Sequence, residues 1–404
     1  MLRLAIVASH PIQYQAPWFR ELAARVELEV FFCHKQDASG QADAGYGKTF
    51  EWDVPLLDGY SSQFLVNVSR QPGVFTFDGC DTPEIGQRLA AGRFDACIVS
   101  GWYLKSYLQA IAACLRLRIP VLLRSDSQRP YDRSLLTRIV KYPAYRALLT
   151  VVAGHLYPGQ ANRRYLEHYG VVPDRLWFVP HCVDDRSFRQ RADDAASNGR
   201  AAAWRDAFSV GADGAIALFV GRLVEEKRPV DFIRAVAAAR RTMRVTGVMA
   251  GAGPLADALR QESDATGAEI RFAGFVNQSQ LPALYATADV VALPARETWG
   301  LVANEALACG ASLVVSDQTG CAPDLIDGLT GRVFPCGNVD HMARTIVDVL
   351  QERKRAPRAV LEAIRAMSDR YGAKAAAEAT VAAVTVAAGR TPARRRTVLQ
   401  SVQP

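Results

Sequence analysis

Apolar residues in this chain gather in short continuous runs, and stretches with helical spacing separate the runs. A run without alternating polar positions is typical of a parallel strand that helices cover on both faces. In the first half this pattern predicts helices at 16–25 and 105–116. The strands predicted there are 2–8, 28–33, 96–100, 121–124, 148–153 and 176–179.

The second half repeats the pattern, and helical spacing is clear near its end at Met342, Ile346, Val349 and Leu350. The predicted strands are 216–220, 244–250, 270–273, 290–293, 312–316 and 331–334, and the predicted helices are 229–240, 254–265, 280–287 and 340–353. Strands that alternate with helices predict an α/β fold of two Rossmann-like, doubly wound domains.

Residues 190–203 lack large apolar side chains, so we interpret them as the connection between the domains. The expected division is an N-terminal domain at 1–188, a C-terminal domain at 189–375, and a helix end with a basic tail at 376–404. Ligands of doubly wound sheets bind beyond the carboxyl ends of the strands. Two such domains facing each other therefore predict an interdomain cleft.

Composition agrees with a two-domain protein of 404 residues. No apolar run reaches the roughly 18 residues of a membrane-spanning helix, and residues 1–10 are better interpreted as a first buried strand than as a signal peptide. The eight cysteines form no Cys-x-x-Cys pair and no cluster with metal-ligand spacing. We therefore expect a cytoplasmic protein.

The net charge of +7 is unevenly distributed. Residues 100–150 hold nine Lys and Arg against two acidic residues, and three arginines follow at 394–396. Such an excess indicates an acidic partner, for which we favour phosphate groups or anionic lipid over nucleic acid. Within it, residues 129–149 mix cations with apolar residues and are interrupted by Pro143. This segment predicts either peripheral contact with an anionic membrane, at the inner face of the plasma membrane, or a solvated helix.

Two glutamates, Glu297 and Glu305, lie eight positions apart around a turn and the start of a helix expected near Leu301. The free backbone N–H groups of a helix start favour an anion, and Gly300 allows a ligand to approach the backbone. Carboxylates suit neutral hydroxyl groups instead. The segment therefore predicts a sugar nucleotide or sugar phosphate, and the alternative is a loop acid followed by an ordinary helix glutamate.

Arg222 and Lys227 follow the strand at 216–220, where Gly221 permits a tight exit. Two cations at the mouth of the cleft can neutralise a diphosphate without a metal. The alternative is a solvated charged turn. The glycines at 251 and 253 begin a dinucleotide fingerprint, but its spacing fails at residue 256, so we interpret this segment as a structural turn.

Gly274, Phe275 and Val276 also follow a strand and could present backbone groups and an apolar wall to a nucleobase. The alternative is a plain loop with a buried ring. His10 follows the first strand, so contact with phosphate, contact with an acceptor hydroxyl and proton transfer are all open to it. A structural histidine is the competing interpretation.

Three residues of the first half are candidates for binding an acceptor, because each lies just past an apolar run. They are Trp102, Arg124 and His155. Core packing is the default alternative for Trp102. His181 has a similar position and is a weaker candidate.

The string Val220-Gly-Arg-Leu223, then Lys227, the Glu297/Glu305 pair and Ala308-Cys-Gly310 resemble the retaining nucleotide-sugar glycosyltransferases of family 4. The resemblance is strong over 219–334, loose over 172–184 and weak in the N-terminal half. It departs from the family where His181-Cys182 replaces Asn-Gly, where His10–Tyr14 replaces a glycine-rich loop, and where Gly101-Trp102 replaces a histidine.

The resemblance implies the GT-B fold, with an acceptor-binding N-terminal domain and a nucleotide-sugar domain after it. Arg222 and Lys227 would bind the diphosphate, Glu297 the donor sugar and Glu305 the ribose. The implied donor-binding set also includes Gly221, Gly274, Phe275, Val276, Thr298, Trp299, Gly300 and Leu301. Such enzymes work without a metal or other cofactor, and the leaving phosphate helps to deprotonate the acceptor.

We therefore expect a glycosyltransferase that moves a hexose-type sugar from a nucleotide-diphosphate donor to an acceptor hydroxyl. The expected acceptor is a surface glycan, such as lipopolysaccharide, capsule or exopolysaccharide, or a lipid-linked precursor. The alternatives are a sugar-nucleotide epimerase or hydrolase on the same fold, or a non-catalytic nucleotide-sugar-binding subunit. The missing fingerprint disfavours an NAD-dependent oxidoreductase.

Overall fold

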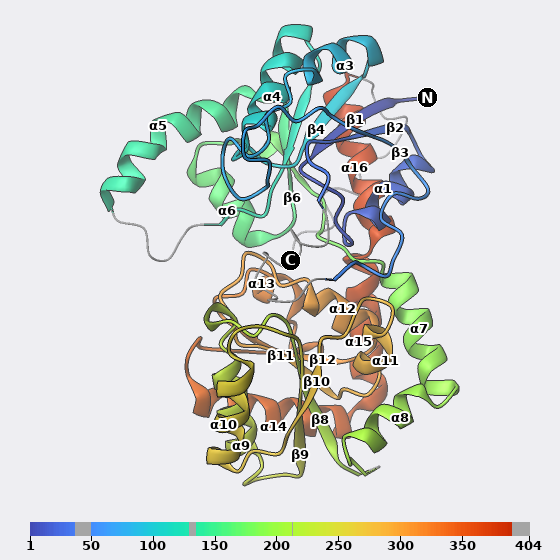
Figure 1. The fold of residues 1–404 in the computed structure, drawn as a ribbon, viewed down its shortest axis with the longest axis vertical. Helices are drawn as coiled ribbons and strands as arrows, with labels where there is room; N and C mark the ends of the chain where they lie inside the picture. Colours follow the sequence, from blue (N-terminus) through green and yellow to red (C-terminus); the bar gives the residue numbers. More distant parts are fainter. Residues whose placement is uncertain (37–49, 129–134, 212, 390–404) are drawn as a thin grey trace.

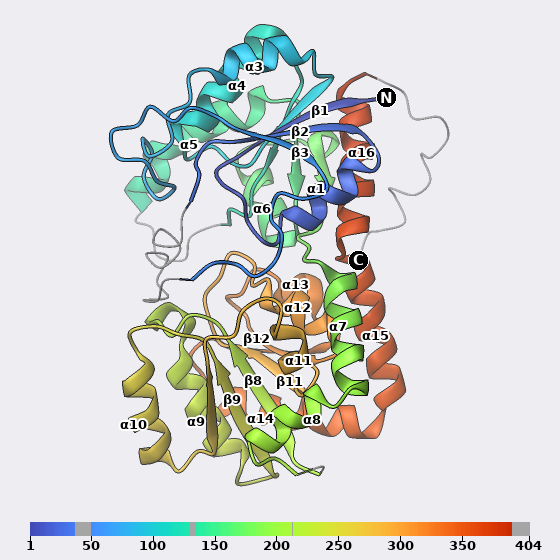
Figure 2. The same cartoon turned by 45° about the vertical axis from the view of Figure 1, so that its right-hand side comes forward.

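The computed structural model describes residues 1–36, 50–128, 135–211 and 213–389. These residues form two α/β domains, one above the other in Figure 1, each with a parallel sheet between layers of helices. Figure 2, turned by 45°, shows that two helical segments on one side of the molecule connect the domains. The tail at 394–396 and residues 129–134 of the basic segment lie outside the described residues.

The N-terminal sheet has seven strands in the order β3-β2-β1-β4-β5-β6-β7. Its strands are β1 (Arg3–Ala8), β2 (Glu27–Phe32), β3 (Ser61–Phe64), β4 (Ala96–Val99), β5 (Val121–Arg124), β6 (Gly154–Tyr157) and β7 (Leu176–Phe178). Its helices are α1 (Ala16–Ala23), α3 (Ile85–Gly92), α4 (Lys105–Leu117), α5 (Leu135–Val151) and α6 (Gln160–His168). The central strands are almost completely buried, as their unbroken apolar runs require.

The C-terminal sheet has six strands in the order β10-β9-β8-β11-β12-β13. Its strands are β8 (Ala215–Val220), β9 (Val245–Ala250), β10 (Ile270–Gly274), β11 (Val290–Leu293), β12 (Ser312–Ser316) and β13 (Gly331–Phe334). Its helices are α9 (Pro229–Ala239), α10 (Ala256–Thr266), α11 (Leu281–Tyr285), α12 (Val302–Ala308), α13 (Ala322–Leu325) and α14 (Val339–Arg355). The prediction of two doubly wound domains is confirmed.

One predicted strand is wrong. Residues 148–153 belong mostly to the end of α5, and the strand that follows is β6, from Gly154 to Tyr157. The apolar run at 148–153 continues the buried face of a helix, whereas β6 is a short strand with a histidine in it. Pro143 lies within α5 and does not end it.

The chain crosses between the domains twice. After β7 it enters α7 (Asp185–Ser197) and α8 (Arg200–Ala207), so the connection expected at 190–203 is helical and packs on α11 and α12. After α15 (Pro357–Arg370) it returns through α16 (Ala373–Ala387), which packs against α1 of the N-terminal domain. The expected domain limits at 188 and 375 fall inside α7 and α16.

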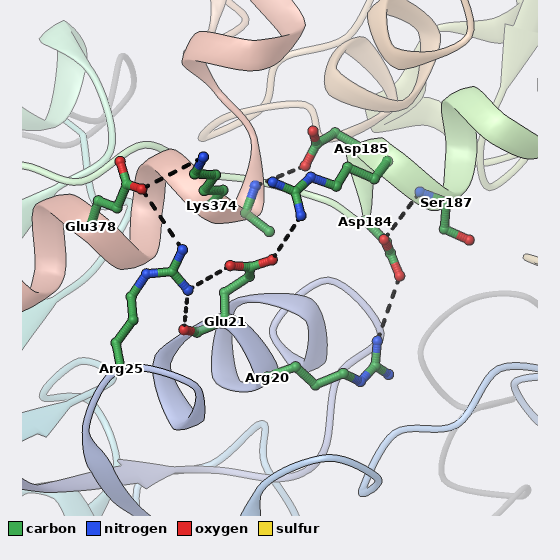
Figure 3. A network of polar contacts seen from close by, with 10 residues as sticks. Arg20, Glu21, Arg25, Asp184, Asp185, Ser187, Lys374 and Glu378 are labelled. Carbon is green, nitrogen blue, oxygen red and sulfur yellow. Dashed lines mark hydrogen bonds and ion pairs between the residues drawn. The ribbon is translucent and has the colours of Figure 1, made fainter.

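Polar contacts tie the two crossings together. The Ala373 N–H, at the start of α16, donates to the Asp185 carboxylate at 2.8 Å, and Asp185 is the first residue of α7. Figure 3 shows the ion pairs around this contact, in which Arg25, in the turn after α1, faces Glu21 and Glu378. Partly exposed pairs of this kind contribute little one by one, whereas the Asp185 carboxylate is buried and joins the start of α7 to the start of α16.

Candidate active site

One of the two predicted cations meets the first glutamate at the carboxyl end of the C-terminal sheet. The Lys227 ammonium lies 2.7 Å from the Glu297 carboxylate, although the two residues come from different loops. Both side chains are about one-fifth exposed, so a ligand can reach them. Arg222 precedes them in the loop that leaves β8. The loop after β8 therefore carries both cations, and the loop after β11 supplies the carboxylate that pairs with Lys227.

The glycine turn after β9 is hydrogen-bonded to the loop that follows β8. The Gly221 N–H donates to the Ala250 carbonyl at 3.0 Å, and the Leu223 N–H donates to Ala252 at 2.9 Å. A Cβ on Gly251 would lie 1.8 Å from the Gly221 carbonyl oxygen. Only glycine permits this approach, so the turn positions the loop that bears Arg222.

The backbone conformation at residue 300 requires a glycine. Its φ is +97°, and a Cβ there would lie 2.9 Å from the Thr319 side chain. The helix expected near Leu301 begins at Val302, with Leu301 as its N-cap residue. The indole of Trp299 is buried and donates to Asn304 at 2.8 Å, which leaves the backbone of this turn as the part that can face a ligand.

Glu305, on α12, is buried beside two hydrogen-bond donors. The Tyr285 hydroxyl donates to one carboxylate oxygen at 2.8 Å, and the Gln278 amide donates to the other at 3.3 Å. Burial raises the pKa of Glu305 to about 7, and the two donors lower it only in part. The carboxylate therefore lies in a place where its negative charge is costly without further hydrogen-bond donors.

A small cavity between the domains reaches Glu305. It has a volume of about 110 Å³. Gln278 and Glu305 line it from the C-terminal domain, and Gln13, Tyr14 and Arg20 line it from the N-terminal domain. The cavity is therefore lined by residues of both domains and reaches the buried carboxylate.

The loop after β5 contacts the same region from the N-terminal domain. The Thr298 hydroxyl donates to Asp126 at 2.6 Å, and the Gln128 amide donates to the Glu297 carbonyl at 2.8 Å. Thr298, predicted to bind the donor, is thus also an interdomain contact. Through the Glu297 carbonyl, the N-terminal domain helps to position the residue that pairs with Lys227.

A second contact involves residues 50–55, a segment between β2 and β3. The Phe50 ring lies 4.6 Å from the ring of Phe275, which the sequence predicts beside a nucleobase. The Asp53 carboxylate accepts hydrogen bonds from the N–H and the hydroxyl of Ser279, and the Asn277 amide donates to the Glu51 carbonyl at 2.8 Å. This segment therefore covers the loop at 274–279.

Replacing both Phe50 and Asp53 with alanine should loosen this contact. Burying a phenylalanine contributes about 2 kcal/mol, and the carboxylate adds charge-assisted hydrogen bonds. We expect amide hydrogen exchange at residues 275–279 to become at least about tenfold faster. Glu51→Ala is the matched control, since Glu51 contributes only its main-chain carbonyl. Equal exchange in all three proteins would contradict the contact.

His10 lies after β1 and is hydrogen-bonded through Nδ1 to the Ser9 hydroxyl at 3.0 Å. Burial first, and then the nearby His34, lower the pKa of His10 to about 4. The imidazole is therefore neutral near pH 7. A neutral ring can accept a proton or a hydrogen bond, but it adds no positive charge for a phosphate, so that candidate role loses its electrostatic basis.

Arg124 does not face an acceptor, contrary to the prediction. Its guanidinium is buried, donates to the carbonyls of Val179 and Pro180 at 2.9 Å each, and lies 4.6 Å from the centre of the Trp18 ring. Arg124 thereby fixes the backbone just before α7, where the chain first passes from one domain to the other. The strand end was recognised correctly, but the side chain turns toward the crossing because the carbonyls there need a donor.

Arg124→Ala should therefore destabilise the fold. Removing the guanidinium leaves two buried carbonyls without their donors, which costs about 2–4 kcal/mol. Urea unfolding followed by circular dichroism would measure the loss. Arg116→Ala on the exposed face of α4 is the control and should change the free energy of unfolding by less than about 0.5 kcal/mol. A loss as small for Arg124→Ala would refute this role.

The other two acceptor candidates also make packing contacts. His155 is 1% exposed, and its Nε2 is hydrogen-bonded to the Leu149 carbonyl at 2.8 Å. Trp102 is stacked on Tyr165 at 6.3 Å between ring centres and is partly buried. The prediction of acceptor contact is corrected for His155, because its ring lies in the core. For Trp102 it stays a prediction, since that ring is only partly buried. His181 is enclosed, with its ring 5.4 Å from Trp299.

Several residues of the site could not be found from the sequence. Gln128 and the segment 50–55 reach loops more than 160 positions away, and no periodic pattern marks them. Asp324 of α13 is another such residue, because it accepts hydrogen bonds from the Gln160 N–H of α6. In the sequence, Asp324 is an acidic residue in a segment typical of turns. Such a residue is found in a solvated turn as often as in an interdomain hydrogen bond.

No group of three or more His, Cys, Asp or Glu side chains within the described ranges could hold a metal ion. No helix in those ranges combines the length and the hydropathy needed to cross a bilayer.

Comparison with known proteins agrees with this geometry. Residues 202–366 match the family described as glycosyl transferases group 1. A GDP-mannose-dependent alpha-(1-6)-phosphatidylinositol monomannoside mannosyltransferase of Mycolicibacterium smegmatis is 33% identical over 163 residues, which are 38% of this chain and 42% of that protein. A D-inositol 3-phosphate glycosyltransferase of Geodermatophilus obscurus is 33% identical over 205 residues, 48% of this chain and 44% of that protein. The chain thus spans less than half the length of these two relatives.

Solved structures match over almost the whole chain. A glycosyltransferase from Rickettsia africae has a TM-score of 0.71 at 12% identity and covers 96% of this chain, which in turn covers 99% of it. HepE of Anabaena, crystallised with UDP and glucose, has a TM-score of 0.67 at 15% identity, with coverage of 96% and 100%. The chain therefore has the GT-B fold, and its C-terminal domain is the part that matches the glycosyl transferases group 1 family.

Proposed function

We propose that this protein is a retaining glycosyltransferase of the family 4 type, which moves a sugar from a nucleotide-diphosphate-sugar to an acceptor hydroxyl. The observation that carries the proposal is the 2.7 Å approach of Lys227 to Glu297, where Lys227 belongs to the loop after β8 that also bears Arg222. A cation for phosphate and an acceptor of sugar hydroxyl hydrogen bonds lie side by side there. The buried Glu305 gives the ribose its partner.

Each residue has one role in this proposal. Arg222 and Lys227 bind the diphosphate and stabilise the charge that grows on it as the glycosidic bond breaks. Glu297 accepts hydrogen bonds from the donor sugar, and the turn at Gly300 presents backbone groups to sugar and phosphate. The acceptor hydroxyl attacks from the face that the phosphate leaves and passes its proton to that phosphate. No residue in this scheme depends on a metal.

In this proposal the ion pair of Lys227 and Glu297 rearranges when the donor binds. When a diphosphate arrives, the ammonium exchanges one carboxylate for phosphate oxygens, and Glu297 becomes able to accept hydrogen bonds from hydroxyl groups. His10, as a neutral imidazole on the opposite domain, is suited to accept a hydrogen bond from the acceptor hydroxyl. We assign it this positioning role and leave proton removal to the phosphate.

The proposed acceptor is a growing surface glycan or a glycolipid, handled in the cytoplasm at the inner face of the plasma membrane. The name of one relative supports a glycolipid, since it is a phosphatidylinositol monomannoside mannosyltransferase. The names of similar proteins include both nucleobases: one relative uses GDP-mannose, and one solved structure contains UDP.

Thermal unfolding in the presence of UDP-sugars and GDP-sugars would test donor binding. A donor at a hundred times its Kd stabilises the protein by about 2.7 kcal/mol, which raises the Tm measurably. Product analysis with the donor that binds then separates the alternatives. Hydrolysis or epimerisation without any acceptor would favour the epimerase or hydrolase, and binding without turnover would favour a non-catalytic subunit.

Peripheral contact with an anionic membrane is a separate proposal, carried by α5. This helix has exposed Lys141 and Arg146 and no acidic residue from Leu135 to Val151. Juxtamembrane cations contribute about 1 kcal/mol each at an anionic surface and are screened by salt. Flotation with anionic vesicles at low salt would support the contact, and absence of binding at low salt would refute it.

A further inference from the structure

Exposed apolar side chains of the N-terminal domain gather around one loop. This loop, residues 65–84, joins β3 to α3. Its exposed fractions are 62% for Val66, 55% for Val68, 69% for Phe75 and 54% for Phe77, and Tyr103 beside it is 52% exposed. Single exposed apolar residues are ordinary, but several on one short loop mark an interaction surface.

The loop is held in a defined conformation. The Asn67 side chain accepts hydrogen bonds from the N–H groups of Ser69 and Asp81 and donates to the Gly79 carbonyl. At its tip, the Lys105 N–H donates to the Phe77 carbonyl at 2.8 Å. Ordering this loop costs conformational entropy, and neither phenylalanine ring offsets it by burial in the protein. The folded loop therefore keeps the rings of Phe75 and Phe77 exposed to solvent.

Helix α5 lies beside this loop. The Tyr103 hydroxyl donates to the Val74 carbonyl at 3.2 Å, and the neighbouring Trp102 ring lies 6.5 Å from the Tyr145 ring of α5. Both views of the molecule show the loop and α5 on the same side of the N-terminal domain (Figures 1 and 2). The apolar loop and the basic helix thus form one surface.

The charges of this surface suit anionic headgroups. Lys141 and Arg146 of α5 are exposed, while two of the loop's acidic groups are paired within the protein. Asp81 lies 2.6 Å from the Lys105 ammonium, and Glu84 accepts from the Val66 N–H at 2.7 Å. Asp78, next to Phe77, is the exposed acid of the loop. It limits insertion to the tips of the rings.

We propose that Phe75 and Phe77 insert into the hydrocarbon edge of an anionic membrane while α5 lies on its headgroups. Aliphatic Val66 and Val68 next to the rings favour hydrocarbon over a glycan, whose hydroxyl groups need polar partners. The inference rests on the proposed peripheral membrane contact of α5. It adds the apolar side chains that would enter the membrane. It does not depend on the transfer reaction.

Vesicle flotation of the full chain tests the inference. The vesicles contain equal parts of phosphatidylglycerol and phosphatidylcholine. Phe75→Ser with Phe77→Ser should weaken binding at least about tenfold per ring, from the apolar area that each would bury. Leu115→Ser with Leu117→Ser, two exposed positions of α4, is the matched control and should bind like the unmodified protein. Unchanged melting temperatures would show that all proteins fold.

Salt and a spectroscopic probe separate this inference from the contact by α5 alone. High salt should weaken binding of every variant, yet the ratio between the unmodified protein and the double phenylalanine variant should persist. Phe75→Trp should gain fluorescence that brominated acyl chains quench. Equal flotation of the phenylalanine variant and the unmodified protein would overturn the inference and leave α5 as the contact. Loss of transfer to a soluble glycan with unchanged flotation would also overturn it, in favour of acceptor binding. No flotation at low salt would refute both.

Discussion

Arg222→Ala should lower kcat for sugar transfer by about 10²–10³-fold, the loss that follows removal of one preorganised donor to a developing negative charge. The charge on the leaving diphosphate is greater in the transition state than in the bound donor. The effect should therefore appear in kcat more than in KM. Lys227→Ala should behave similarly, and in addition it leaves the Glu297 carboxylate without the ammonium that lies 2.7 Å away. Initial rates with a radiolabelled donor would measure both variants.

Arg332→Ala is the matched control, because Arg332 is an exposed arginine on β13 of the same domain. It should keep the activity of the unmodified protein. Arg222→Lys should recover part of the loss, since it restores charge but not the planar fork of donors. If Arg222→Ala and Lys227→Ala both retained full transfer, the diphosphate role of these residues and the proposed function would be wrong.

Glu305→Gln should make the protein more stable at pH 8 while it weakens donor binding. Burial raises the pKa of Glu305 from 4.5 to about 7, so the folded state favours the protonated acid. Below pH 4.5 the group is neutral in both states. As pH rises from 4.5 to about 7, the unfolded chain ionises first, and stability falls by up to about 3 kcal/mol. A glutamine carries no such penalty.

Urea unfolding at pH 4.5 and pH 8 would measure this effect. The stability of Glu305→Gln relative to the unmodified protein should increase between the two pH values, by as much as about 3 kcal/mol. Isothermal titration with UDP or GDP at pH 8 should show an affinity at least about tenfold lower, because a glutamine accepts weaker hydrogen bonds from ribose hydroxyl groups. A variant that matched the unmodified protein in both measurements would contradict a ribose role for this buried carboxylate.

A variant that retains the carboxylate separates the two effects. Tyr285→Phe removes one hydroxyl donor to Glu305 but keeps the acid. It should raise the pKa of Glu305 further, since the lost hydrogen bond favours the charged form. Its stability should therefore decline with pH over a wider range than that of the unmodified protein. The direction is opposite to that expected for Glu305→Gln.

Prediction from sequence succeeded where the signal is local. The strands at 121–124, 290–293, 312–316 and 331–334 coincide with β5, β11, β12 and β13, since each lies between clear turns, and the first three are buried throughout. Position after such a strand also placed Lys227 and Glu297 at one sheet edge. Parallel strands bring their carboxyl ends together, so local order was enough to predict this meeting.

Prediction was wrong where the direction of a side chain decides the role. Arg124 and His155 both lie at or within strands of the N-terminal sheet, but each side chain satisfies a carbonyl of its own domain or crossing. Sequence order does not show which carbonyl lacks a partner, because that depends on how distant segments pack. The same limit hides Phe50 and Asp53, whose partners lie more than 220 positions away.

The return of α16 has a consequence for biosynthesis. Trp18 of α1 is 1% exposed, and its indole donates to Thr380 of α16 at 3.1 Å, so the last described helix covers part of the first domain's core. During translation residues 1–178 leave the ribosome long before residues 373–387. The N-terminal domain therefore remains without one of its layers until the C-terminal domain has been made. We expect the nascent chain to expose the apolar face around Trp18 through that interval, when chaperones and aggregation compete for it.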